Sequence, residues 1–317
     1  MIVPVTREAH HRAHLEPILA YLPWSPVQRS KDDIALVASY GGLMHARRAR
    51  FSRIILAQHG AGQSYGGDKK MAEHPSYPGG SANGDVGLFL APNEHSADRW
   101  RRAYPQASVA VVGCPRLDII PERVPGPGPV IAFSFHWDFD KIPEMRSASG
   151  TYWRAIAELA KRYRVIGHGH PKRRDIGRYF RSIRVPFVAD FDEVCRRADV
   201  YACDNSSTMF EFAATGRPVI VLNRPEIRDA QGIVTDPGYR RSVSHGLRFW
   251  DAAGIGVNVD DPAALEAAVR LAVEDPPDQK LAREAALGLV YAYRSGAAER
   301  AAAAIREWAG IAEAVAA

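Results

Sequence analysis

The sequence is poor in the features that mark secreted and membrane-spanning proteins. It has three cysteines in 317 residues, and their spacing gives neither a CxxC metal pair nor an even disulfide framework. No run approaches the roughly 18 consecutive apolar residues of a membrane span, and residues 1–14 lack the apolar core of a signal peptide. We therefore expect a cytoplasmic protein, with peripheral contact to a membrane left open.

A strong charge of one sign is also missing. Lysine and arginine number 41 against 36 acidic residues, for a net charge of +5. This mild excess suits phosphate-rich ligands without requiring nucleic acid, and no aromatic and basic array or recognition helix stands out. A nucleic acid acceptor stays open on these grounds. With 46% hydrophobic residues the chain can bury a large core, and its length favours two lobes over one domain.

Short apolar runs rich in β-branched residues recur along the chain, which is typical of parallel strands covered on both faces. Four lie in the first third, at 35–39, 53–58, 86–91 and 109–113. After VPGPGP at 124–129, six more follow at 130–135, 164–169, 185–189, 199–204, 218–223 and 254–259. The pattern predicts an α/β fold with one lobe over 1–125 and a nucleotide-donor-binding lobe over 126–285. Residues 286–317 are expected to form a helix that could return to the first lobe.

The segment 198–223 carries the clearest chemistry, because a strand there ends in a polar turn that opens a helix. Open α/β sheets bind ligands at the carboxyl ends of their strands, and unpaired amides at a helix start attract phosphate. The residues expected to hold a diphosphate are Asp204, Ser206, Ser207 and Thr208. Glu211, one helical turn later, could accept hydrogen bonds from a ribose diol. The alternative is an ordinary helix cap with Glu211 as its capping-box acid.

Two histidines follow strands of the predicted sheets. His59 precedes Gly60, which lets a substrate approach the backbone, and a neutral imidazole is a suitable acceptor for the proton of an attacking hydroxyl. We therefore predict that His59 is the general base. His170 is expected to contact phosphate. The basic residues that follow it are Lys172, Arg173 and Arg174, and they would place cationic donors beside a diphosphate.

Several segments resemble, in order, the CDP-glycerol glycerophosphotransferases that build teichoic acid polymers. They are IILAQHGAGQSYGGD at 54–68, VVGCPRLDII at 111–120, RVIGHGHPKRRD at 164–175 and DNSSTMFEFAATGRPVIVL at 204–222. VIAFSFHWD at 130–138, which contains His136, occupies the place of that family's strand and Trp-containing loop. The resemblance implies the glycosyltransferase-B fold, with two Rossmann-like lobes of parallel sheets, an interlobe cleft and a nucleotide-diphosphate-activated donor.

Other residues have weaker claims to function. Arg116 and Asp118 either contact substrate or form a local ion pair that fixes a turn, and Gly60 and His136 are likewise substrate contacts or structural. The histidine pair at positions 10 and 14 has no third ligand nearby in the sequence, so no metal is assigned. No cofactor is expected, because a helix terminus and the basic cluster could neutralise a leaving diphosphate.

The resemblance is weaker on the acceptor side, because residues 61–67 stand where the family's His-Gly pair is followed by a threonine, a proline and paired lysines. Lys69 and Lys70 lie slightly later and could serve in place of those lysines. The leading prediction is transfer of a glycerophosphoryl-type group from a CDP-glycerol-like donor to a hydroxyl acceptor. The acceptor could be a cell-envelope polymer, another glycan or another macromolecule. One alternative is a glycosyltransferase of the same fold that uses a nucleotide-sugar, and another is a non-catalytic nucleotide-binding module.

Overall fold

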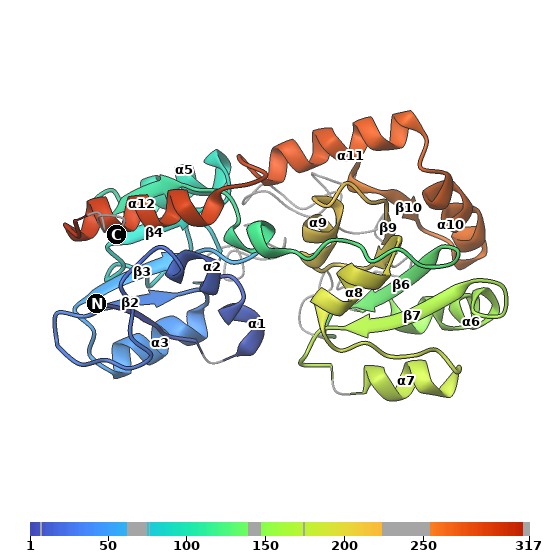
Figure 1. The fold of residues 1–317 in the computed structure, drawn as a ribbon, viewed down its shortest axis with the longest axis horizontal. Coiled ribbons are helices and arrows are strands. Elements are labelled where there is room, and N and C mark those ends of the chain that lie inside the picture. The colour runs from blue at the N-terminus through green and yellow to red at the C-terminus, as the bar shows by residue number, and fades with distance from the viewer. Residues whose placement is uncertain are drawn as a thin grey trace, which may run out of the picture.

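The computed structural model describes residues 1–6, 8–61, 75, 77–138, 147–173, 175–223 and 254–312. It contains two five-stranded sheets, ordered β1-β2-β3-β4-β5 and β10-β9-β8-β6-β7, and every strand pairing in both is parallel. Figure 1 shows the sheets side by side, each flanked by helices. The predicted α/β fold with two Rossmann-like lobes is confirmed.

The first lobe is built from the N-terminal part of the chain. Its strands are β1 (Ile2–Pro4), β2 (Ile34–Val37), β3 (Arg53–Ala57), β4 (Leu88–Ala91) and β5 (Ser108–Val111). Its helices are α1 (Ala9–Arg12), α2 (Glu16–Leu19), α3 (Tyr40–Arg48), α5 (Glu94–Ala103) and the 3-10 helix η1 (Pro115–Ile119). Every residue of β2 and β4 is buried, because α3 and α5 cover one face of the sheet while α2 and a C-terminal helix cover the other.

The second lobe contains β6 (Val130–Phe135), β7 (Arg164–Gly169), β8 (Val200–Cys203), β9 (Val219–Leu222) and β10 (Val257–Val259). Its helices are α6 (Ser149–Leu159), α7 (Ile176–Ser182), α8 (Phe191–Arg197), α9 (Thr208–Ala213), η4 (Pro262–Ala264), α10 (Leu265–Glu274) and α11 (Pro277–Val290). Apolar residues of α6, α7 and α10 pack on one face of the sheet, and those of α8, α9 and α11 pack on the other. This is the layering expected for a doubly wound sheet.

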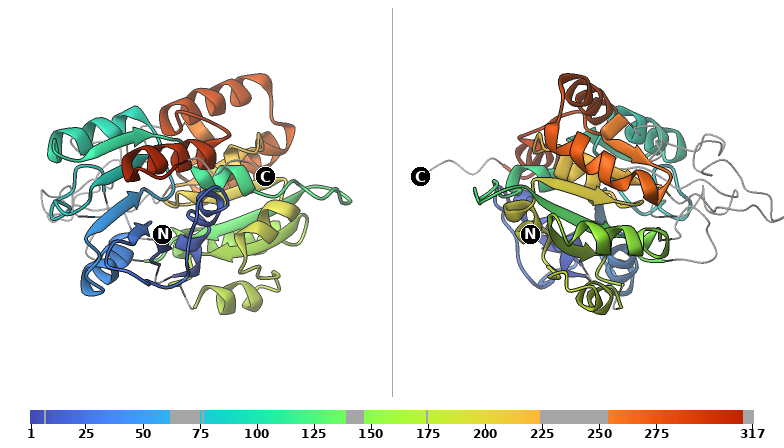
Figure 2. Two further views of the ribbon diagram at one scale, coloured as in Figure 1. Left: turned by 60° about the vertical axis from the view of Figure 1, so that its left-hand side comes forward. Right: turned by 90° about the vertical axis from the view of Figure 1, so that its right-hand side faces the viewer.

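After α11 the chain returns to the first lobe, as Figures 1 and 2 show. The returning helix is α12 (Ala297–Ala309), whose buried alanines and Ile305 pack with α2 and the first sheet. Trp308 lies so close to Gly87 that a Cβ at that glycine would come within 2.4 Å of the indole. The Arg53 guanidinium lies over the Trp308 ring, 4.6 Å from its centroid. The two ends of the chain therefore share one core.

One predicted strand is wrong. Residues 185–189 form no strand, and Phe187 makes a single isolated bridge to Gly167 of β7. The backbone N–H of Gly167 donates to the Pro186 carbonyl, and the N–H of Val188 donates to the Gly167 carbonyl. Because Pro186 has no N–H to donate, the pairing does not continue into a ladder. The strand β1 was not expected. All three cysteines are buried thiols. Among the helices that the structure describes, none combines the length and the apolar composition that crossing a membrane requires.

Candidate functional site

The ends of three strands, the short helix α1 and the segment that follows α1 bring six imidazoles together. His59 lies two residues after β3, whereas His136 and His170 directly follow β6 and β7. Neighbouring rings form a continuous series. In the first lobe the ring centroids are 5.9 Å apart for His14 and His59, 4.8 Å for His59 and His11, and 4.1 Å for His11 and His10. The series continues into the second lobe, with 5.5 Å between His10 and His170 and 5.0 Å between His170 and His136. We refer to these six residues as the histidine cluster. It joins the two lobes.

The hydrogen bond of His59 defines its reactive nitrogen. Its Nδ1 lies 2.6 Å from the carbonyl oxygen of Ala38, which can only accept, so Nδ1 carries the proton and Nε2 is the basic nitrogen. Burial lowers the pKa of His59, and the backbone hydrogen bond opposes this effect. The predicted general base is therefore a neutral imidazole with a defined tautomer.

His170 has the opposite tautomer. Its Nδ1 accepts the backbone N–H of Lys172 at 3.1 Å, so Nε2 carries the proton and can donate. Burial lowers the pKa of His170 to about 2, and the imidazoles of His136 and His10 act in the same direction. His168, which lies in β7 two residues before His170, is buried and places Nδ1 2.8 Å from the Val188 carbonyl oxygen. His170 is thus the donor at this strand end.

The basic residues after His170 separate. Lys172 is exposed and remains beside the histidine cluster, with Nζ 3.7 Å from Oε1 of Glu8. Arg173 turns away, because its guanidinium pairs with Asp175 at 2.9 Å and donates to the Ser149 hydroxyl at 3.1 Å. Arg174 lies outside the described residues. Lys172 is therefore the better placed of the two described cations.

Gly60 provides a contact between the lobes. Its φ is +64°, and a Cβ there would come within 2.9 Å of the Ser207 Oγ. The left-handed backbone and the close approach both require glycine. The turn that carries His59 therefore touches the loop after β8, where the sequence predicts a phosphate-binding segment.

The other hydroxyls of that loop are engaged within the second lobe. The Thr208 Oγ1 is 2.8 Å from the Tyr201 hydroxyl and 2.9 Å from the Ser206 Oγ. The buried Asp204 carboxylate accepts the backbone N–H of His136 at 2.7 Å and that of Ala148 at 3.1 Å. Burial raises the pKa of Asp204 to about 6, and these hydrogen bonds oppose the rise. Asp204 thus fixes the backbone that carries His136.

Glu211 lies in a buried ionic network between the lobes. Its carboxylate is 4.0 Å from the Arg116 Nε and 4.0 Å from the His14 Nε2. Burial raises the pKa of Glu211 to about 7, and Arg116 opposes the shift. Arg116 also pairs with Asp192 of α8. Asp118 instead accepts the backbone N–H of Ala298 at 2.7 Å, so the mutual ion pair considered from the sequence is not formed.

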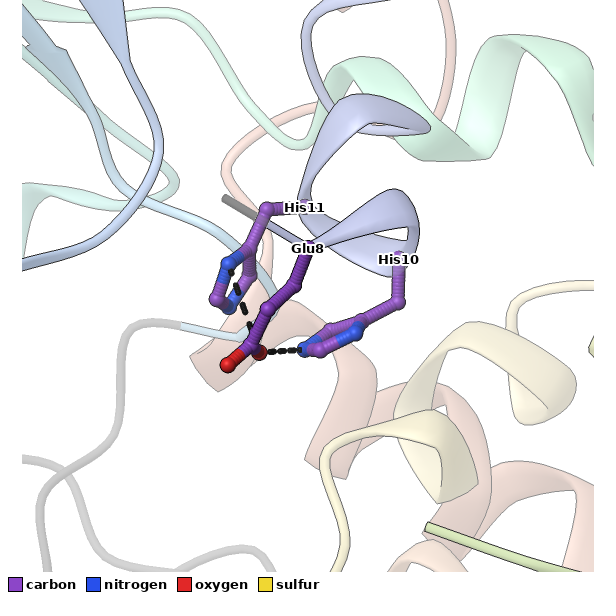
Figure 3. A group of neighbouring side chains, drawn as sticks. All are labelled: Glu8, His10 and His11. Atoms are coloured by element: carbon purple, nitrogen blue, oxygen red, sulfur yellow. Dashed lines mark ion pairs between the residues drawn. The ribbon is translucent and has the colours of Figure 1, made fainter. Parts of the chain in front are cut away.

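Glu8 lies between two imidazoles of α1, and Figure 3 shows all three side chains converging. Its Oε2 is 3.1 Å from the His10 Nε2 and 3.9 Å from the His11 Nδ1. One ligand atom from each residue lies within 4.8 Å of the others, so the group could hold a metal ion. This group was not predicted from the sequence, in which His10 pairs with His14 at helical spacing. The helix α1 ends at Arg12, and His14 turns instead toward Cys114 and Glu211.

The fold of the chain is similar to that of several proteins of known structure. No family model and no curated protein sequence matches the chain. Solved structures do match it, among them the wall teichoic acid polymerase TagF, with a TM-score of 0.61 and 13% identity over 98% of this chain and 89% of that one. The chain therefore has the two-lobed glycosyltransferase-B fold.

Two further similar structures have the same architecture. Staphylococcus aureus MnaA, solved with UDP, gives a TM-score of 0.60 and 13% identity over 98% of this chain and 97% of that one. A putative UDP-N-acetylglucosamine 2-epimerase from Listeria monocytogenes gives 0.57 and 11% identity over 96% and 95%. At these identities the similarity establishes the fold.

Proposed function

We propose that this chain is a transferase that moves a glycerophosphoryl-type group from a CDP-alcohol-like donor to a hydroxyl acceptor. The observation that carries the proposal is the pair of opposite tautomers in the histidine cluster. His59 presents a basic nitrogen from the first lobe, and His170 presents an N–H donor from the second. One imidazole can take a proton while the other stabilises negative charge.

In the proposed reaction the His59 Nε2 removes the proton of the acceptor hydroxyl as its oxygen attacks the distal phosphorus of the donor. The bond from that phosphorus to the bridging oxygen breaks, and CMP leaves with the electron pair. The Nε2–H of His170 and the ammonium of Lys172 stabilise the charge on the diphosphate. Positioning and electrostatics dominate such transfers, so two fixed imidazoles and a cation are a sufficient protein contribution.

The contact of Gly60 with Ser207 supports the same assignment, because it holds the His59 turn against the predicted donor loop. Ser207 is our candidate among the loop hydroxyls for direct contact with the diphosphate, since Ser206 and Thr208 bond to each other. The Glu211 carboxylate would have to leave its network with Arg116 and His14 to reach a ribose. We therefore assign Glu211 to the interface between the lobes and retain its ribose contact only as a prediction for the nucleotide-bound state.

A second candidate is a glycosyltransferase that uses a nucleotide-sugar. The structural similarity to MnaA, solved with UDP, favours it. In that reaction the acceptor oxygen attacks the anomeric carbon, and the whole nucleoside diphosphate leaves. The same two histidines would serve as base and as stabiliser of the leaving group.

The nucleotide product distinguishes these functions. The protein is incubated with CDP-glycerol, CDP-ribitol and a panel of UDP-sugars, together with polyol and glycan acceptors, and the products are separated by chromatography. Release of CMP supports the first proposal. Release of UDP or CDP would instead support the glycosyltransferase. Binding of the nucleotide donors without formation of a product from any of them would indicate a binding module.

A further inference from the structure

The residues Glu8, His10 and His11 have no part in the transfer step described above. We propose that these three residues bind one divalent transition-metal ion, and that zinc is the preferred metal. The ligand set of two imidazoles and one carboxylate matches the nitrogen and oxygen ligands that zinc takes in proteins. The three residues are almost consecutive in sequence, so α1 brings them together without help from distant segments.

The distances fit a small cation. Zinc binds nitrogen and oxygen at about 2.0 to 2.2 Å, which separates neighbouring ligands of a tetrahedral ion by about 3.4 Å. The observed separations from the Glu8 Oε2 are 3.1 Å to the His10 Nε2 and 3.9 Å to the His11 Nδ1, on either side of that value. Small rotations of the two imidazoles seen in Figure 3 would complete the site.

Two of the three ligand atoms are otherwise unsatisfied. Oε2 of Glu8 and Nδ1 of His11 are buried, and neither makes a hydrogen bond within the part of the chain that the structure describes. Buried polar atoms without partners are rare and costly in native proteins. A cation between them would satisfy both at once.

The charge pattern favours a cation over an anion. A phosphate at this position would meet the Glu8 carboxylate, which already faces both imidazoles. The other carboxylate oxygen, Oε1, lies 3.7 Å from the Lys172 ammonium, which helps to orient Oε2 toward the imidazoles.

The location suggests what the ion would do, and this step rests on the proposed transfer. The His59 ring is 4.8 Å from His11, and the His170 ring is 5.5 Å from His10. Three protein ligands leave one position of a tetrahedral ion for a substrate oxygen, as in catalytic zinc sites. An acceptor hydroxyl bound there would be more acidic and would lie beside the predicted base.

The test is a metal titration of the full-length protein, prepared without a polyhistidine tag and stripped with a chelator. Zinc affinity is measured in competition with a chromophoric chelator, and cobalt is used as a spectroscopic probe. We expect one equivalent of zinc, together with the intense visible bands of tetrahedral cobalt. The variants Glu8→Gln and His11→Ala should each weaken zinc binding about tenfold or more. His45→Ala, which removes an exposed histidine of α3, should leave it unchanged.

Glu8→Gln keeps the shape of the side chain, so circular dichroism and a thermal melt that match the wild type would exclude misfolding as the cause. Equal zinc affinity in the wild type and Glu8→Gln would overturn the proposal. So would a wild-type protein that binds inorganic phosphate here but no zinc. The titration needs no donor, so stoichiometric zinc binding by a protein that releases no nucleotide product would support the site and count only against the proposed transfer.

Discussion

Glu211 is the acidic residue whose ionisation should affect stability most. It is 3% exposed, and burial raises its pKa from 4.5 to about 7. A carboxyl group with a higher pKa in the folded than in the unfolded state stabilises the fold below the unfolded value. That contribution is lost as the pH rises through the folded value. With about 1.4 kcal/mol per pKa unit, ionisation of Glu211 should cost the fold about 3 kcal/mol between pH 4.5 and pH 7.

Glu211→Gln removes this titration and keeps the side-chain shape. Urea unfolding of the wild type and the variant is compared at pH 5 and pH 8, so that all other titrating groups cancel. We expect the variant to gain about 3 kcal/mol relative to the wild type at the higher pH. Glu158→Gln, at a carboxylate of α6 that is 63% exposed, is the control and should show no such trend. Parallel pH profiles for the wild type and Glu211→Gln would refute the reasoning.

Three further predictions concern the contacts around the histidine cluster. Gly60→Ala should lower the free energy of unfolding by at least about 1 kcal/mol, because φ is +64° and the new Cβ would press on Ser207. Chemical denaturation would measure this loss. Asp204→Ala should lower the free energy of unfolding by about 2 to 4 kcal/mol in the same assay, because it leaves the backbone N–H groups of His136 and Ala148 unpaired. A loss of less than about 0.5 kcal/mol would show that those N–H groups find other partners. His170→Ala should weaken binding of a nucleoside diphosphate, measured by calorimetry, more than binding of the parent nucleoside, and an equal effect on both would remove its phosphate role.

The sequence was sufficient to predict most of the fold, because parallel strands covered on both faces appear as continuous apolar runs. The strands that fall within or on the predicted runs are β3, β4, β6, β7, β8, β9 and β10. The error at 185–189 has a local cause, since Pro186 interrupts the donor pattern that a ladder needs. The strand β1 was not predicted, because its short run ends in Pro4 and proline is depleted in strands.

The site was harder to predict, because it depends on contacts between distant segments. His59 and His170 could be selected from their positions after strands, whereas their proximity to α1 could not. The partners of Glu211, which are Arg116 and His14, come from the other lobe, so a capping or ribose role was the natural reading of the sequence alone. Glu8 and His11 adjoin the histidine that was considered for metal binding. The helical spacing of His10 and His14 favoured that pair instead. Because α1 ends at Arg12, His14 does not lie on the same helix as His10.

The central claim is that His59 is the general base, and the turnover of His59→Ala tests it most directly. Because its Nδ1 is held by the Ala38 carbonyl and its Nε2 is the basic nitrogen, the variant should lose about 10² to 10⁴ in turnover. Its nucleotide affinity should stay within about twofold of the wild type, since the base does not hold the donor. His45→Ala, on the exposed surface of α3, should retain full activity. Turnover that survives in His59→Ala within a few-fold, or nucleotide affinity that collapses together with activity, would contradict the account.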